Sequence, residues 1–278
     1  MATYSRRQFF ALTGGGLIAA YAAAACGDDG DNDGGATPAE NANTPATTPA
    51  VSAGVDRGAL AIRWFGQSMF VITSPEGTRV LLDPFNDIGY PVPPPLDVDA
   101  ATITHEHPDH NNASLAGVAA TVHRGLTADG WNDIDATAGD VRIRSVRSFH
   151  DGAQGAERGR NAIFVLEVAG MRVVHLGDLG HELDDARVSA IGGPTDALMV
   201  PVGGMFTIDA GVATRVAGRL GARVVFPMHY KTDAIAFPLA PVDPFLEGKE
   251  VQRVGSTDIR ISKDDLPGTQ TVMVLDYA

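Results

Sequence analysis

The chain has 278 residues, of which 44% are hydrophobic and 20% are charged, a balance that fits a packed enzyme better than a disordered chain. Its net charge is −13; residues 1–55 hold two arginines and five acidic residues, which leaves 19 basic and 29 acidic residues, or −10, for the rest. Such a body without a Lys/Arg cluster repels a phosphate backbone, so we expect no nucleic-acid partner. A bound metal could still attract a small anionic substrate.

The N-terminal residues resemble an export signal. Arg6 and Arg7 precede an uncharged, Ala- and Gly-rich run over 9–25, which resembles the twin-arginine type. The run is shorter than the ~20 strongly apolar residues that a membrane-spanning helix needs. Cys26 follows three alanines, as at a lipoprotein cleavage site, although Ala23 stands where such sites usually carry Leu.

Three segments are therefore predicted. Residues 1–26 form a twin-arginine-type signal that ends in a lipoprotein cysteine, 27–56 form a disordered linker with almost no large apolar side chain, and 57–278 form one folded domain. The expected location is periplasmic or otherwise extracytoplasmic, with membrane contact only through a lipid on Cys26. Because Cys26 is the only cysteine of the chain, any metal in the domain must be held by histidine and carboxylate.

The domain opens with strand-like segments. Residues 59–65, 69–73 and 79–82 are apolar or β-branched runs that predict an antiparallel meander. A short buried strand over 100–104 follows, and then a short helix over 112–120.

Later segments repeat the pattern. Residues 163–168 and 171–175 predict a hairpin through Ala169-Gly170, and a helix carries apolar residues at four-residue spacing until Gly221. The other strands are expected over 141–146, 197–200 and 223–226, near Ile259, and over 271–275. Strands and helices in this order predict an α+β protein with two sheets packed face to face and helices outside.

The strongest local signal is a cluster of possible metal ligands. His105, His107, Asp109 and His110 fall within six residues, directly after a buried strand. Pro108 stiffens the turn between them. Packing three histidines and an aspartate together without a cation would cost desolvation and repulsion, so the cluster predicts metal binding. Imidazole and carboxylate suit Zn, Fe or Mn.

Three later residues follow predicted strands. His150, Asp178 and His229 come after 141–146, 171–175 and 223–226. Each alone would be typical of an ordinary loop or core residue. Together with the cluster they are the complement that a metal site needs, because loops at strand ends collect functional groups.

This ordered set of seven residues resembles the metallo-β-lactamase superfamily. Flanking stretches resemble the branch of L-ascorbate-6-phosphate lactonase-like hydrolases; they are Leu81–Phe85, Asn161–Phe164, His175–His181, Pro201–Thr207 and Met228–Lys231. The resemblance covers roughly 59–278.

The resemblance implies a four-layer αβ/βα sandwich with the site at one edge between the sheets. It implies two divalent ions, Zn first with Mn or Fe open, and a hydroxide between them. His105, His107 and His150 would hold one ion and Asp109, His110 and His229 the other, with Asp178 bridging both.

Further residues enter with the resemblance. Asp83 matches an early strand-end aspartate and would brace the ligands through hydrogen bonds. Gln67 departs from the histidine that many relatives carry, which leaves the chemistry on the substrate side open. His181 and Tyr230 could contact substrate or brace the site, or lie outside it.

The expected function is that of an exported hydrolase that cleaves an ester, lactone or phosphodiester of a small molecule. Asp109 and Asp178 are the candidate catalytic carboxylates, Asp109 for proton transfer. The alternatives are a lipid-directed phosphodiesterase and a non-catalytic metal- or ligand-binding lipoprotein. A nuclease is disfavoured by the acidic body, and a diiron redox enzyme by the lack of a flavin domain. The oligomeric state is not predicted.

Overall fold

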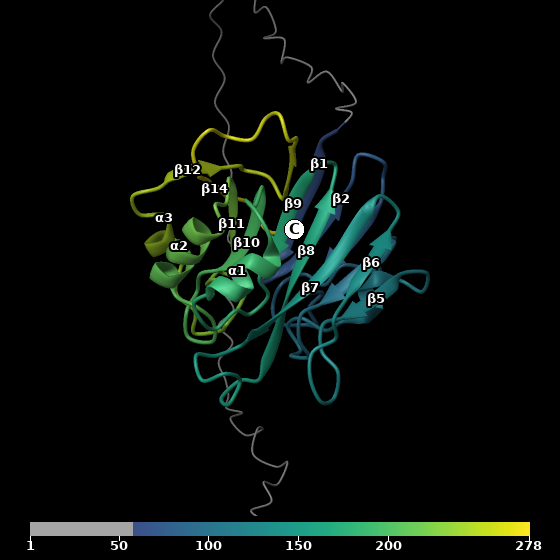
Figure 1. Ribbon diagram of the computed structural model, residues 1–278, viewed down its shortest axis with the longest axis horizontal. Coiled ribbons are helices and arrows are strands. Elements are labelled where there is room, and N and C mark those ends of the chain that lie inside the picture. Colours follow the sequence, from purple (N-terminus) through teal and green to yellow (C-terminus); the bar gives the residue numbers. More distant parts are fainter. Residues whose placement is uncertain (1–57) are drawn as a thin grey trace, which may run out of the picture. The chain divides into compact units, whose positions relative to one another are not determined.

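A computed structural model describes residues 58–278 of the chain (Figure 1). The predicted export signal, lipoprotein cysteine and linker lie outside these residues. Within 58–278, no helix combines the length and the hydropathy needed to cross a bilayer.

Two mixed β-sheets make up the fold (Figure 1). The six-stranded sheet has the order β13-β1-β2-β3-β4-β5, and its strands are β1 (Leu60–Gly66), β2 (Met69–Thr73), β3 (Arg79–Leu82), β4 (Ala100–Ile103), β5 (Thr121–Arg124) and β13 (Asp258–Ile261). The eight-stranded sheet has the order β12-β14-β11-β10-β9-β8-β7-β6, and its strands are β6 (Asp135–Ala138), β7 (Val141–Phe149), β8 (Arg160–Val168), β9 (Met171–His175), β10 (Ala197–Pro201), β11 (Val224–Met228), β12 (Glu250–Arg253) and β14 (Thr271–Val274).

The α-helices lie on the eight-stranded sheet. They are α1 (Asp185–Ile191), α2 (Ala210–Arg219) and α3 (Asp243–Leu246). α1 packs on β7, and α2 packs on β10 and α3, so the three lie beside one sheet in Figure 1. Asp184 and Asp209 start α1 and α2, because each carboxylate accepts a main-chain N–H of the first helical turn at 2.8 Å.

The six-stranded sheet is buried on both faces. Along β1 the even-numbered residues Leu60, Ile62 and Trp64 join the core shared with the eight-stranded sheet, whereas Phe65 joins a second, smaller core. This alternation follows from the two-residue period of a strand. The predicted meander is confirmed, since β1, β2 and β3 pair antiparallel.

One sequence prediction, for a segment that packs in the smaller core, is wrong. A helix over 112–120 was expected, but the chain forms only a single 3-10 turn, η1 (Ala113–Ala116). Asn112 does not cap a helix, because its side-chain oxygen accepts from the Ser114 hydroxyl and its amide nitrogen donates to the Phe85 carbonyl at 3.1 Å. Gly117 ends the turn with a φ of 75°. Irregular segments, among them 85–98 and 234–239, cover this face instead.

The remaining strands match the predicted ones in part, and the structure contains several elements more. The hairpin turns at Ala169 and Gly170, both with positive φ, as a two-residue connection requires. β7 runs three residues further than expected, which brings its end directly to His150. The short strands β5, β6 and β12 and the helices α1 and α3 were not predicted. The αβ/βα sandwich itself is confirmed, with the helical layer on the six-stranded sheet reduced to η1 and loops.

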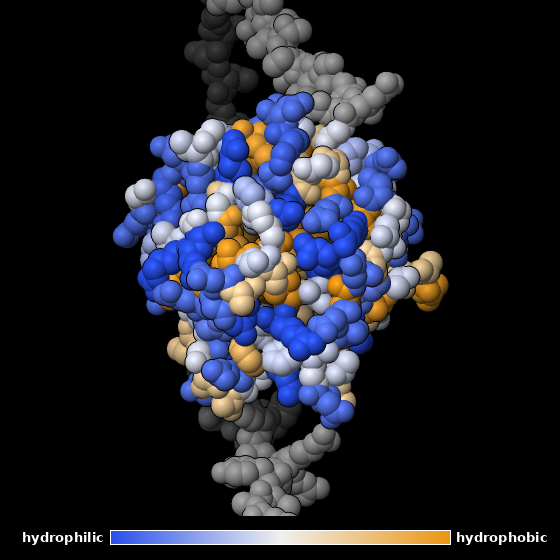
Figure 2. Space-filling view, in the orientation of Figure 1, coloured by the Kyte–Doolittle hydropathy of each residue, from blue (hydrophilic) through white to orange (hydrophobic). Residues whose placement is uncertain are grey.

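The viewed face of the molecule is mainly hydrophilic (Figure 2). Hydrophobic side chains gather there in small groups between polar ones. This distribution is typical of a water-exposed surface rather than of one large apolar interface.

Candidate metal centre

The predicted site residues come from strand ends that share one edge of the sandwich. Asp83 follows β3 and His105 lies two residues after β4, and these two strands are parallel. His150, Asp178 and His229 follow β7, β9 and β11, which all run in one direction. Because the carboxyl ends of parallel strands meet at the same edge, five distant segments converge there.

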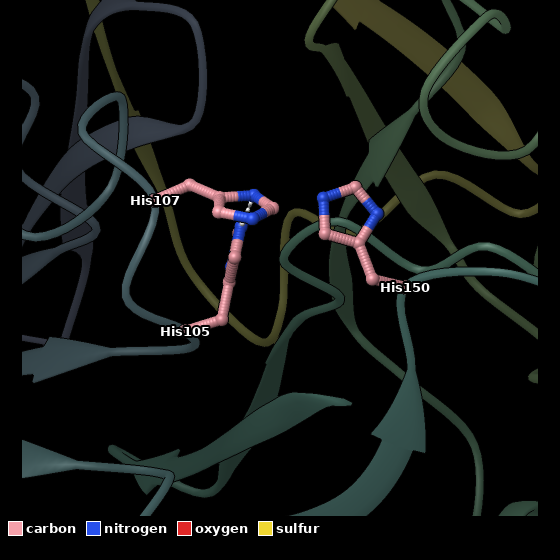
Figure 3. Close-up of side chains that lie close together, drawn as sticks. All are labelled: His105, His107 and His150. Carbon is pink, nitrogen blue, oxygen red and sulfur yellow. Dashed lines mark hydrogen bonds between the residues drawn. The ribbon is translucent and has the colours of Figure 1, made fainter. Parts of the chain in front are cut away.

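One group of possible ligands consists of three histidines. One nitrogen of each of His105, His107 and His150 lies within 4.8 Å of the others. His105 Nε2 lies 3.1 Å from His107 Nδ1. Figure 3 shows the three rings turned toward one another, with His150 facing the other two. His105 and His150 are buried and His107 is exposed, so this group lies beneath an opening to solvent.

The second group lies beside the first. It consists of Asp109, His110, Asp178 and His229, again with ligand atoms within 4.8 Å of one another. His110 Nε2 lies 3.3 Å from Asp109 Oδ2 and 3.1 Å from Asp178 Oδ1, and His229 Nε2 lies 3.7 Å from Asp109 Oδ2.

Asp178 touches both groups. Its Oδ2 atom lies 3.1 Å from His150 Nε2 and 3.2 Å from His229 Nε2. One carboxylate therefore stands between the two sets of nitrogens, where it could bridge two cations.

Buried atoms without partners fit a metal at this place. His110 Nε2 and Asp178 Oδ1 are buried and, although they lie 3.1 Å apart, neither makes a hydrogen bond of acceptable geometry within the protein. Such atoms cost free energy unless something satisfies them. The donor set of imidazole nitrogens and carboxylate oxygens suits divalent Zn, Mn or Fe, so the residues present fit a centre of two ions.

Asp83 orients the histidines from behind. Its carboxylate accepts hydrogen bonds from the main-chain N–H of Thr104 at 2.8 Å, from the Thr104 hydroxyl at 2.6 Å and from His110 Nδ1 at 2.7 Å. The Thr104 oxygen in turn lies 3.0 Å from His105 Nδ1. With both Nδ1 atoms engaged, the Nε2 atoms of His105 and His110 face the centre. Because the Asp83 oxygens are satisfied in this way, we treat Asp83 as a brace and not as a ligand.

Two amide side chains hold Asp109 and Asp178, one through the carboxylate and the other through the main chain. Gln67 Nε2 donates to Asp109 Oδ2 at 2.9 Å. Asn161 accepts the main-chain N–H of Asp178 at 3.1 Å and donates to the Leu176 carbonyl at 2.9 Å. Gln67 therefore restrains a candidate catalytic residue directly.

The backbone is strained at the same edge. Of the six non-glycine residues in 58–278 with left-handed φ, three belong to the site: Gln67 at 46°, Asp83 at 42° and His229 at 51°. This conformation is costly and persists where the surrounding structure enforces it. The strain agrees with the assignment of this edge as the functional one.

Two glycines allow the ligand loops to approach closely. A Cβ on Gly180 would lie 2.2 Å from the carbonyl carbon of His150, and one on Gly203 would lie 2.2 Å from the carbonyl oxygen of His229. Both distances are too short for a side chain, so glycine is required where these loops cross.

Burial and charge set the protonation of the centre. Burial alone would lower the pKa of His110, but the carboxylates of Asp178 and Asp109 raise it well above its ordinary value, and they raise that of His229 to about 9. Burial, together with the positive charge of His110, lowers the pKa of His105 well below its ordinary value. Although burial opposes it, His110 holds the pKa of both carboxyls well below the usual range. Because a histidine binds a metal through an unprotonated nitrogen, a cation held here would displace a proton from His110 and from His229.

His181 and Tyr230, for which the sequence left open both a role at the site and a position outside it, do not line the cavity over the ligands. The Nε2 atom of His181 accepts the main-chain N–H of Phe149, and its Nδ1 atom donates to the Glu182 carbonyl. Both ring nitrogens are therefore used by the main chain, and His181 lies away from the cavity over the ligands. Tyr230 is buried against Trp64, with ring centroids 5.5 Å apart, and also lies away from that cavity.

The cavity over the centre adds residues that the sequence did not single out. It has a volume of about 320 Å³, and besides the ligands its walls are Pro108, Arg158, Phe206 and Phe237. Phe206 and Asn161 fall in stretches that resemble the lactonase-like branch, so a signal was present for them. Arg158 and Phe237 lie in loops without a motif.

Comparison with known proteins identifies the family. Residues 61–229 match the family described as the Beta-lactamase superfamily domain. The chain belongs to the metallo-β-lactamase superfamily. It is 29% identical over 203 residues to a UPF0173 metal-dependent hydrolase of Thermococcus onnurineus, covering 66% of this chain and 88% of the relative. A UPF0173 hydrolase of Hyperthermus butylicus is 31% identical over 211 residues and covers 66% and 87%.

Solved structures agree with this placement. A Thermotoga maritima protein described as a Zn-dependent hydrolase of the metallo-β-lactamase superfamily is 35% identical, covers 79% of this chain and 100% of its own, and superposes with a TM-score of 0.62. A metallo-β-lactamase-fold protein of Bacillus subtilis shares the fold at 13% identity and a TM-score of 0.51, covering 79% and 98%. The chain is thus a metal-dependent hydrolase of the UPF0173 family.

Proposed function

We propose that this metallo-β-lactamase-fold enzyme cleaves an ester, lactone or phosphodiester of a small molecule at a centre of two divalent ions, Zn first. The observation that carries the proposal is the pair of ligand groups that share Asp178 beneath one cavity. His105, His107 and His150 would hold one ion and Asp109, His110 and His229 the other. When bound, two such ions acidify a shared water and polarise the bond to be cleaved.

The residues of the chain supply the remaining chemistry. The side chain of Asp109 is 16% exposed, against 2% for Asp178, so Asp109 is the carboxylate that can exchange a proton with a substrate. Its hydrogen bond from Gln67 holds it in place. Phe206 and Phe237 wall the cavity and limit water, which strengthens the electrostatic interactions inside. Asp178 stays ionised between the two groups.

Lactones are the first substrates to test. The stretches that resemble the L-ascorbate-6-phosphate lactonase-like branch include Asn161, which anchors Asp178, and Phe206, which walls the cavity. Residues typical of that branch thus contact the proposed reaction centre, which supports placing the chain there.

The test combines elemental analysis of the purified full chain with a panel of lactones, aryl esters and phosphodiesters, with and without chelator. We expect about two divalent ions per chain, and hydrolysis of at least one class that chelator abolishes and Zn restores. Asp178→Asn should lose both ions and activity, whereas the exposed control Asp129→Asn should keep them. Hydrolysis that persists in the fully metal-free protein would overturn the proposal.

The same panel separates the alternatives. Cleavage confined to a phosphodiester lipid in vesicles would favour a lipid-directed phosphodiesterase, and two bound ions without any hydrolysis would favour a metal- or ligand-binding lipoprotein. We expect no cleavage of DNA or RNA, because the body is acidic.

We further propose export by the twin-arginine route and anchoring through lipid on Cys26, which the paired Arg6 and Arg7 and the alanines before Cys26 support. Arg6→Lys together with Arg7→Lys should retain the protein in the cytoplasm. Cys26→Ser should release the exported protein from the membrane fraction. An unchanged distribution of both variants would contradict the proposal.

A further inference from the structure

We propose that Arg158 makes the cavity selective for substrates that carry an anionic group, a carboxylate or a phosphate, on a compact apolar body. The inference rests on the proposed hydrolase function and specifies its substrate class. Of the Lys and Arg side chains in 58–278, Arg158 is the one that lines the cavity over the ligands.

The loop that carries Arg158 is built around a buried carboxylate. Asp151 accepts main-chain hydrogen bonds from Ala153 and Gly155, each at 2.8 Å, from Glu157 at 3.1 Å and from Arg158 at 2.7 Å. Four hydrogen bonds to one ionised group are strong and close the loop on itself. The main chain of Arg158 is therefore fixed, a few residues after the ligand His150.

The guanidinium of Arg158 has N–H donors that a ligand could use. One nitrogen donates to the Met205 carbonyl at 3.2 Å, and another lies 3.3 Å from the Glu157 carboxylate. The Glu157 side chain is 65% exposed, so this pair is weak and a ligand can replace it. A guanidinium carries five N–H donors in a planar fork that matches carboxylate and phosphate.

The other residues that line the cavity determine the size and polarity of the uncharged part of the substrate. Phe206, Phe237 and Pro108 present apolar surface, and a cavity of about 320 Å³ lies at the small end of the ligand-site range of ~300–1,000 Å³. The Arg158 side chain is 35% exposed, so a charged group that meets it is partly shielded from water. Apart from the proposed metal ligands, the cavity therefore presents one cationic side chain beside three apolar ones, a combination that favours a small amphiphilic anion.

A purely structural role for Arg158 is the competing explanation. Its bond to Met205 links the loop after His150 to the loop that bears Phe206. Loss of that link would impair neutral and anionic substrates alike. The test must therefore compare two substrates that differ in charge and share the same leaving group.

The experiment compares mono(4-nitrophenyl) glutarate with 4-nitrophenyl butyrate on the zinc-loaded full chain. We expect Arg158→Gln to lower the ratio of kcat/KM for the anionic over the neutral ester by about ten-fold or more, since hydrogen bonds to charged groups are among the stronger ones. Arg158→Lys should lie between wild type and Arg158→Gln. Arg142→Gln is the matched control: Arg142 is exposed at the start of β7, whose other end leads to His150, and it does not line the cavity, so the ratio should stay unchanged. An unchanged ratio in Arg158→Gln would overturn the inference.

A second variant, Glu157→Gln, should increase the selectivity for the anionic ester. Glu157→Gln removes the carboxylate that pairs with Arg158 and leaves the loop's main-chain bonds in place. The ratio should then rise by about two-fold or more, in keeping with the small strength of exposed pairs. A fall in the ratio would count against the inference.

Binding separates failure of the inference from failure of the hydrolase proposal. If the wild type cleaves neither ester, the ester arm of the proposed function fails. Calorimetric titration of the zinc-loaded protein with 4-phenylbutyrate and with phenyl phosphate then decides the inference and distinguishes a carboxylate from a phosphate. Binding of either probe that Arg158→Gln weakens about ten-fold supports it. Equal affinity in both proteins, or no binding, overturns it.

Discussion

The carboxylate of Asp83 receives three hydrogen bonds, two from Thr104 and one from His110. A residue that binds no ion in our assignment thereby fixes which nitrogen of His105 and of His110 faces the centre. The left-handed φ of Asp83 is the conformational cost of that arrangement.

Asp83→Asn should weaken metal binding by about 10–100-fold, the usual cost of losing a partner behind a ligand. The amide cannot accept all three hydrogen bonds, so His110 loses its fixed tautomer. Competition with a zinc-binding dye measures the effect, and the exposed Asp129→Asn variant is the control. Unchanged zinc affinity would show that the ligands orient themselves without Asp83.

At the scale of elements, the site depends on how closely the loops after β7 and β9 approach each other. Gly180 N donates to the Phe149 carbonyl at 3.0 Å, and a side chain at Gly180 would collide with the main chain of His150. The positions of His150 and Asp178 are therefore coupled through the main chain as well as through the centre.

Gly180→Ala should separate these loops, reduce the bound ions per chain and lower the free energy of unfolding by about 1–3 kcal/mol, as overpacking does. Gly152→Ala is the matched control, because a Cβ there meets no atom within 4 Å. Elemental analysis and urea unfolding provide the two readouts. A Gly180→Ala variant with full metal content would contradict the proposed coupling.

Strand register also places an ion network far from the centre. Glu167 on β8 stands opposite Arg142 on β7 and Arg172 on β9. Burial alone would raise the pKa of Glu167, but Arg172, Arg144 and Arg142 lower it overall. A carboxyl with a depressed folded pKa stabilises the protein above its unfolded pKa, and this contribution disappears as pH falls through the folded pKa.

Glu167→Gln should therefore lower the free energy of unfolding at pH 7 by about 0.5–1 kcal/mol, a value kept small because the side chain is partly exposed. The difference from wild type should vanish as the pH falls well below the ordinary carboxyl pKa, about 4.3. Urea unfolding at several pH values measures it, with the exposed Glu76→Gln as control. A difference that persists in acid would have a non-electrostatic origin.

At the scale of the whole molecule, the centre joins the two sheets. Asp83 and His105 come from the six-stranded sheet, and Asp178 and His229 from the eight-stranded sheet. Ions that bind only the folded chain raise its free energy of unfolding by mass action.

Chelation should therefore lower the Tm. At a free zinc concentration about 1,000-fold above the Kd, each bound ion raises the free energy of unfolding by about 4 kcal/mol. For a domain of this size, that corresponds to a rise in Tm of roughly 8–16 °C per ion. Scanning calorimetry with and without chelator measures the shift, and re-addition of zinc should restore it. An unchanged Tm would mean that the sheets dock without help from the ions.

Much of this arrangement could be predicted from the sequence. The strand runs and the ordered set of seven possible ligands point to this fold and edge, because strand periodicity and metal-ligand chemistry are local signals. The helix expected over 112–120 failed because Asn112 bonds to Phe85, a distant residue. The positions of Arg158, His181 and Tyr230 relative to the cavity depend on loop packing, which leaves no periodic trace in the sequence.

Phe206 and Phe237 line the cavity and also pack against the smaller core beneath the irregular cover of the six-stranded sheet. Any redesign of the pocket through these two rings consequently disturbs the folding of that layer. The segment 151–158 reaches the cavity through Arg158 and contributes no side chain to either hydrophobic core. Differences in substrate preference among relatives should therefore accumulate first at Arg158 and its exposed neighbours in that segment, where a change of sequence leaves both hydrophobic cores intact.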